Sequence, residues 1–232
     1  MEPGTGEDKR AESLRQAQAA AEVLFAKMSA RRLVRPGRTE REVSDDVRDL
    51  AGDLLGVKRY WHKRIVRSGP NTLHPYEANP PDRVITPDDI VFCDFGPILE
   101  EWEADFGRTF VLGDDPDKHR IAADLPDVWT KAKTHFDQTP DITGADLYAH
   151  VLDLSTMVGW EHGGAHAGHL IGEFPHEKIA GDQVECYISA DNHLPMRRLE
   201  RSGRQCHWIL EIHLVNRSQG YGGFFEQLLD LS

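Results

Sequence analysis

The chain has 232 residues, of which 39% are hydrophobic and 28% are charged, a balance that is ordinary for a folded globular protein. Its 39 acidic and 27 basic residues give a formal net charge of −12, which argues against nucleic acid and anionic membranes as partners, because both repel an acidic surface. The sequence shows no run of 18 apolar residues and no secretory leader. We therefore expect a cytoplasmic protein that does not engage a membrane.

The first part of the chain predicts two helices and a strand. Apolar residues recur with helical spacing over residues 8–32, and the pattern ends before a Pro-Gly pair. A second helix is predicted to begin at Thr39, because Glu42 three residues later completes a capping box. A short strand-like stretch follows at residues 64–67.

A long loop rich in turn-forming residues then runs over residues 68–81. Long irregular loops are often functional, so its histidine, His74, is a candidate site residue. Beyond the loop the patterns predict strands at 90–95 and 102–112, helices at 118–136 (interrupted near Pro126) and 144–157, and a strand at 207–215. Helices followed by strands occur twice, which indicates an α+β fold built from two similar halves.

Two aspartates lie in the predicted strand pair. Asp94 ends an otherwise apolar strand, and Asp105 follows eleven residues later. If the two strands are antiparallel neighbours, the carboxylates can face one another, and burying both is costly unless a cation compensates their charge. A divalent metal ion explains the pair. The alternative is that one aspartate caps a turn and the other pairs with Arg108.

Further candidate ligands are spread over the C-terminal half. His169 and His176 lie seven residues apart in a segment broken by glycine and proline, and Glu211 and Glu226 are each embedded in apolar residues. His162 and His166, just upstream, are interpreted as residues of a glycine-rich loop. Four carboxylates and a histidine form a ligand set that suits manganese, iron, cobalt or zinc.

The order and spacing of these residues resemble the pita-bread metallohydrolases, the creatinase and aminopeptidase superfamily. The shared features are an Asp, a second Asp eleven residues on, a His-x-x-Gly-x-x-x-His segment and two late Glu. The segment Trp102-x-x-Asp105-x-x-Arg108-Thr109 is similar to the Tyr-x-x-Asp-x-x-Arg-Thr segment of Xaa-Pro dipeptidases and Xaa-Pro aminopeptidases. Two features depart from the family: Glu211-Ile212-His213 replaces a Glu-Pro-Gly-like turn, and only fifteen residues separate the two glutamates.

The two glycines and the proline within residues 1–7 predict a disordered terminus. The resemblance implies a pita-bread fold with a single catalytic domain at 8–232. It implies two divalent ions (Mn, Co, Fe or Zn) that share a bridging hydroxide as the nucleophile. The implied metal ligands are Asp94, Asp105, His169, Glu211 and Glu226. The implied catalytic residues are His74, His176 and Glu211, and the implied substrate contacts are His74, His176 and Arg108, with charge neutralisation as the other role open to Arg108.

The function that follows is a metallopeptidase that cleaves an amide bond at or near a peptide N-terminus, with Xaa-Pro bonds as candidates. Its partner is a small peptide or peptide-like substrate, and a homodimer is left open. One alternative is creatinase-like hydrolysis of a non-peptide C–N bond on the same fold. Another is an interaction protein without catalysis, against which the complete ligand set argues.

Overall fold

The computed structural model describes residues 4–175, 183–200 and 202–231, and it combines helices with an antiparallel sheet, as expected for an α+β protein. The helices are α1 (Gly4–Ala30), α2 (Glu40–Leu55), α3 (Pro116–Gln138) and α4 (Gly144–Met157), with 3-10 turns η1 (Gly69–Leu73) and η2 (Val184–Cys186). The strands are β1 (Ile65–Ser68), β2 (Ile90–Phe95), β3 (Ile98–Leu99), β4 (Trp102–Glu103), β5 (Phe106–Val111), β6 (Glu161–His162), β7 (Leu170–Ile171), β8 (His207–Asn216) and β9 (Tyr221–Leu228).

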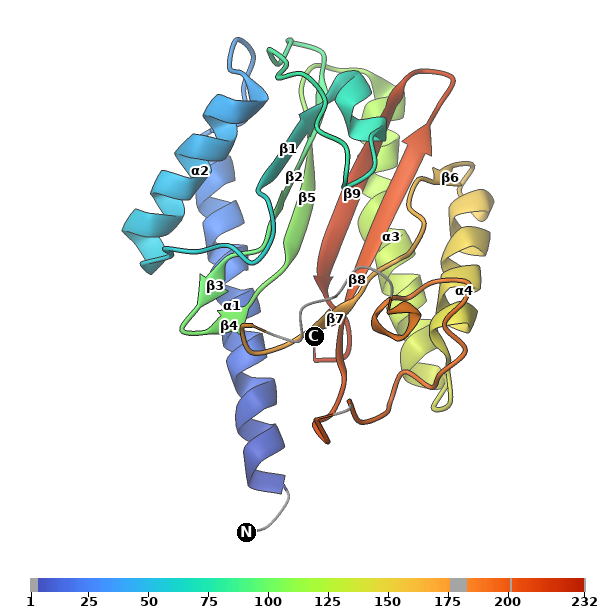
Figure 1. Cartoon of the computed structure of the whole chain (residues 1–232). Coiled ribbons are helices and arrows are strands. Elements are labelled where there is room, and N and C mark those ends of the chain that lie inside the picture. Colours follow the sequence, from blue (N-terminus) through green and yellow to red (C-terminus); the bar gives the residue numbers. More distant parts are fainter. Residues whose placement is uncertain (1–3, 176–182, 201, 232) are drawn as a thin grey trace.

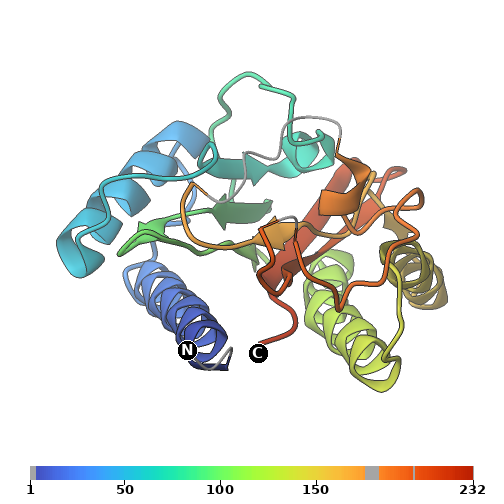
Figure 2. The ribbon, with the colours of Figure 1, turned by 60° about the horizontal axis from the view of Figure 1, so that its bottom comes forward.

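The main sheet has the strand order β1-β2-β5-β9-β8-β6, with β7 paired to β8. Each of these pairings is antiparallel. The N-terminal half supplies β1, β2 and β5, and the C-terminal half supplies β9, β8 and β6, so the two halves meet where β5 pairs with β9. In Figure 2, α1 and α3 lie on one side of the sheet and the segment after β1 lies on the other.

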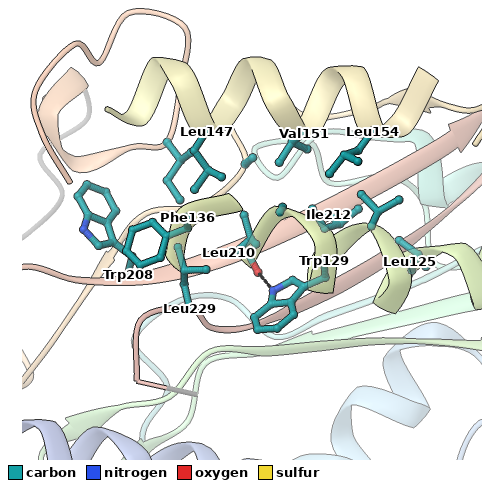
Figure 3. Close-up of a cluster of buried hydrophobic side chains, with 14 of the residues drawn as sticks. Leu125, Trp129, Phe136, Leu147, Val151, Leu154, Trp208, Leu210, Ile212 and Leu229 are labelled. Carbon is teal, nitrogen blue, oxygen red and sulfur yellow. Dashed lines mark hydrogen bonds between the residues drawn. The ribbon is translucent and has the colours of Figure 1, made fainter. Parts of the chain in front are cut away.

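Each half has its own hydrophobic core. In Figure 1, α1 and α2 lie beside the strands of the N-terminal half, and α3 and α4 lie beside those of the C-terminal half. In the N-terminal half, α1 and α2 pack Phe25, Met28 and Val47 against β2 and β5. In the C-terminal half, α3 and α4 pack against β8 and β9, and Trp129 donates a hydrogen bond of 3.0 Å from its Nε1 to the Leu210 carbonyl (Figure 3). Each large apolar side chain buried in this way contributes about 1.5–3 kcal/mol to stability.

Several predicted elements are confirmed and others need correction. The capping box is present: Thr39 accepts a hydrogen bond from the amide of Glu42, whose side chain accepts one from the amide of Thr39. The first helix begins at Gly4, earlier than residue 8. The helix at 116–138 runs through Pro126 without the predicted interruption, because Leu125, Trp129 and other residues of its buried face hold it against the sheet.

The strand predicted over residues 102–112 is divided in two. Trp102–Glu103 pairs with β3, whereas Phe106–Val111 joins the main sheet beside β2. The break falls at Ala104 and Asp105, so Asp105 lies just outside the ladder rather than within it. None of the described helices is both long and apolar enough to cross a bilayer.

Candidate metal centre

A row of residues across the sheet brings three acidic side chains together. In the strand register Asp94 of β2 is opposite Gly107 of β5, Gly107 is opposite Glu226 of β9, and Glu226 is opposite Glu211 of β8. Directly opposed residues lie about 4.5–5.5 Å apart in an antiparallel sheet, so the row gathers carboxylates from both halves of the chain. A Cβ built on Gly107 would lie only 2.6 Å from the Phe224 ring, so glycine is required by the close packing here.

Asp105 lies beside this row because the chain leaves the ladder immediately before β5. Its two carboxylate oxygens face two imidazoles: Oδ1 is 3.1 Å from Nε2 of His62, and Oδ2 is 3.1 Å from Nε2 of His169. His169 precedes β7, whose pairing with β8 brings the histidine to the sheet. Nε2 of His169 also lies 3.9 Å from Oε1 of Glu226. Asp94, Asp105, His169 and Glu226 are thus brought together, and all four are buried.

His62, between α2 and β1, was missed by the sequence reasoning. Its Nε2 lies 3.1 Å from Asp105 and 3.5 Å from Oδ1 of Asp94, and its side chain is only 5% exposed. One indication of its role was present in the sequence: His62 comes just before the strand predicted at residues 64–67, and that strand pairs with the strand of Asp94. That pairing places Ile65 opposite Asp94, which brings the preceding residues to the same end of the sheet.

Glu211 contacts His166, a residue interpreted from the sequence only as part of a loop. Nδ1 of His166 is 3.1 Å from Oε1 of Glu211, and the His166 ring packs against the Tyr187 ring with centroids 4.8 Å apart. His162 does not line the cavity; its Nε2 is 3.1 Å from the His166 carbonyl oxygen. The glycine-rich loop is therefore part of the site through His166.

The charges at the centre are strongly coupled. Burial raises the pKa of Asp94 to about 7, against the opposing effect of His62. Burial and the charges of Asp105 and Asp94 raise the pKa of Glu226 well above its ordinary value. Although burial opposes it, His62 and His169 hold the pKa of Asp105 below its usual range. Burial alone would lower the pKa of either imidazole, yet Asp105 and its neighbours raise both to about 9. The centre thus strongly favours added positive charge.

The residues fit divalent metal ions. Two groups of described residues each offer ligand atoms that lie within 4.8 Å of one another: His62, Asp94 and Asp105 form one group, and Asp105, His169 and Glu226 form the other. Asp105 belongs to both groups, as a bridging ligand would. Oδ1 of Asp94 and Oε2 of Glu226 are buried and have no hydrogen-bond partner among the described residues. Orphaned buried carboxylate oxygens are costly, and a cation would satisfy them.

The centre opens into a cavity of about 570 Å³. Its wall includes aromatic side chains and histidines, among them Trp61, Tyr76, Phe174, Tyr187, His74, His166 and His213. His74 is exposed on the segment that follows η1. The guanidinium of Arg67 holds this segment by donating hydrogen bonds to the carbonyls of His74, Pro75 and Ala78. A buried arginine thereby positions an exposed histidine at the cavity.

Arg108 and His176 are the remaining predicted site residues. Arg108 is not among the residues that line the described cavity. Its guanidinium donates to the Glu226 carbonyl at 2.8 Å and lies between the Phe106 and Phe225 rings, 3.6 and 3.8 Å from their centroids. This placement favours the role of neutralising and bracing the acidic row over contact with a substrate. His176 lies outside the described residues.

Several known peptidases resemble this chain in sequence and fold. Over 160 residues the chain is 28% identical to an Xaa-Pro dipeptidase of Lactobacillus helveticus, a match covering 68% of the chain and 43% of the relative. The chain thus spans less than half the length of this relative. A dipeptidase structure from Mycobacterium ulcerans is 27% identical, with a TM-score of 0.74 over 95% of this chain and 54% of that one.

A methionine aminopeptidase structure from Thermotoga maritima, 19% identical, superimposes with a TM-score of 0.70 over 95% of this chain and 92% of that one. These likenesses confirm the pita-bread fold. The sequence profile of metallopeptidase family M24 matches residues 12–198, which is most of the chain. The chain therefore belongs to metallopeptidase family M24.

Proposed function

We propose that the protein is a dinuclear metal-dependent peptidase that hydrolyses an amide bond at or near the N-terminus of a short peptide, with Xaa-Pro bonds as the candidate substrates. The observation that carries the proposal is the pair of overlapping ligand groups joined by Asp105 beside a cavity. The relatives named Xaa-Pro dipeptidase support the substrate class.

Asp94, Asp105, His169, Glu211 and Glu226 would hold the two ions, and Asp105 is common to both ligand groups. When bound, such ions lower the pKa of water and supply a nucleophile at neutral pH. Glu211 lies opposite Glu226 in the β8–β9 ladder, and its Oε1 is 3.1 Å from Nδ1 of His166. Its carboxylate could therefore bind a metal ion beside Glu226 and exchange a proton with His166.

The protein's own residues would orient the substrate and move the proton. Burial tends to raise the pKa of Glu211, but the His166 imidazole more than offsets this and lowers it. Glu211 is therefore kept ionised, as a carboxylate that accepts a proton and passes it to the leaving nitrogen must be. His74, at the cavity and held by Arg67, would donate a hydrogen bond to the substrate carbonyl oxygen.

The test is a substrate screen after metal exchange. Protein stripped of metal is reloaded with manganese, cobalt or zinc and is offered Xaa-Pro dipeptides, methionyl peptides and creatine. We expect metal-dependent cleavage of Xaa-Pro dipeptides. Cleavage of creatine alone would instead support non-peptide C–N hydrolysis, and silence on every substrate with every metal would support a binding protein.

Two variants separate the metal ligands from the substrate contacts. Asp105→Asn should abolish metal-dependent turnover because it removes the carboxylate common to both ligand groups. His74→Ala should impair turnover while leaving both ions bound, because His74 belongs to neither group. If Asp105→Asn binds two equivalents of metal as tightly as the wild type, the ligand assignment is wrong.

A further inference from the structure

His62 lies at the metal centre but is not one of the five expected ligands. The rings of Trp61 and His62 are in contact, with centroids 4.5 Å apart, and Trp61 Nε1 donates a hydrogen bond of 3.0 Å to the Ala104 carbonyl. The adjoining backbone also makes room for the pair. A Cβ built on Gly96 would lie 2.2 Å from the His62 ring and 2.4 Å from Trp61 Nε1, so any side chain at residue 96 would displace the imidazole.

The orientation of the His62 ring matches that of His169. Nδ1 of His62 is 2.7 Å from the Lys63 carbonyl, and Nδ1 of His169 is 2.8 Å from the Leu170 carbonyl. Each Nδ1–H donates to a backbone oxygen, which leaves each Nε2 directed at one oxygen of Asp105. Metal-binding histidines are commonly fixed by such a bond from the other ring nitrogen, and both imidazoles of this site have it.

The distances around His62 fit a shared ion. Its Nε2 is 3.1 Å from Asp105 Oδ1 and 3.5 Å from Asp94 Oδ1. Ligand atoms that each lie about 2.1 Å from one ion are roughly 3.0–3.4 Å apart in octahedral or tetrahedral geometry. Both distances from the His62 Nε2 are therefore close to the spacing of ligand atoms in a coordination shell, and the three residues offer ligand atoms within 4.8 Å of one another.

We propose that His62 is a ligand of the ion held by Asp94 and Asp105, so that each ion of the pair has one imidazole: His62 on one and His169 on the other. The inference rests on the proposed dinuclear centre and adds a sixth ligand to it. An imidazole on each ion shifts the preference of the centre towards cobalt and zinc relative to manganese, since nitrogen ligands suit the former better.

The test uses the cobalt(II)-substituted protein and proton NMR. Nδ1–H protons of coordinated imidazoles exchange with solvent and are shifted far outside the normal range by the paramagnetic ion. We expect two such signals in the wild-type protein loaded with two ions. His62→Ala should lose one signal and bind one cobalt ion at least about tenfold more weakly in calorimetric titration. His74→Ala is the matched control, because it removes a cavity imidazole that contacts neither ligand group, and it should keep both signals and both affinities.

The outcomes distinguish this inference from the proposed function. A wild-type protein that binds two ions but shows one exchangeable imidazole signal would refute the role of His62 while leaving the dinuclear centre intact. This count needs no variant, so it applies even if His62→Ala does not fold. Equal or tighter cobalt binding by folded His62→Ala would also refute the assignment, since His62 would then act only as a counter-ion that metal displaces. A wild-type protein that binds no ion would overturn both proposals.

Discussion

Gly107 joins the two halves of the site, and replacing it with alanine tests the sheet register directly. The added Cβ would lie 2.6 and 2.7 Å from two atoms of the Phe224 ring and 3.1 Å from the Cβ of Glu226. Phe224 cannot move away freely, because it is buried with Ile65 and Phe92. The strain must therefore displace the ring, β9, or Glu226 itself.

Overpacking of this kind costs about 1–3 kcal/mol. In a protein of this size about 1 kcal/mol lowers the melting temperature by roughly 2–4 °C, so Gly107→Ala should melt roughly 2–12 °C below the wild type. The measurement is calorimetric melting of the metal-free protein, followed by metal titration. We expect weaker metal binding as well, because Glu226 lies opposite Gly107 in the ladder.

Gly52→Ala is the matched control for this prediction. Gly52 is exposed on α2, and a Cβ there would meet only the Val57 carbonyl at an ordinary 3.7 Å. Alanine in a helix interior is more stable than glycine by about 0.5–1 kcal/mol, so this variant should melt slightly above the wild type and bind metal normally. A Gly107→Ala protein with wild-type melting and wild-type metal affinity would show that the deduced close contact, and the row built on it, is wrong.

Four further predictions concern stability and metal binding. Trp129→Phe removes the hydrogen bond to the Leu210 carbonyl and should lower the free energy of unfolding in urea by about 1–3 kcal/mol, whereas no change would mean that the bond adds nothing. Thr39→Ala removes the capping box of α2 and should cost about 1 kcal/mol, measured by circular dichroism melting. Arg108→Met should lower the melting temperature yet leave KM unchanged for a dipeptide with a free C-terminal carboxylate, and a large rise in KM would restore a substrate contact for Arg108. Adding metal at 100 times its dissociation constant should stabilise the stripped protein by about 2.7 kcal/mol for each ion bound, and a chelator should reverse this.

Local sequence patterns were sufficient to predict the helices and strands that depend mainly on residues close together in the chain. The capping box at Thr39 marks the start of a helix through two side-chain hydrogen bonds three residues apart, and the structure has both. The strand at 90–95 and the helix at 144–157 were predicted with the observed bounds, because the strand is apolar apart from Asp94 and the helix keeps its apolar residues at helical spacing. The ordered set of carboxylates and His169 indicated the family, and the structure brings four of the five expected ligands to one point.

Tertiary structure alone decided how the site is assembled. The break before β5 depends on which partner each half of 102–112 finds, and it lets Asp105 face two imidazoles at once. The side chain of Arg108 reaches the Glu226 carbonyl because β5 pairs with β9, a strand more than a hundred residues later in the chain. His62 has no motif of its own. It reaches the metal centre because β1 pairs with β2 and because Gly96 leaves space for its ring. Contacts of this kind depend on how distant segments pack together, and not on the residues beside His62 in the sequence.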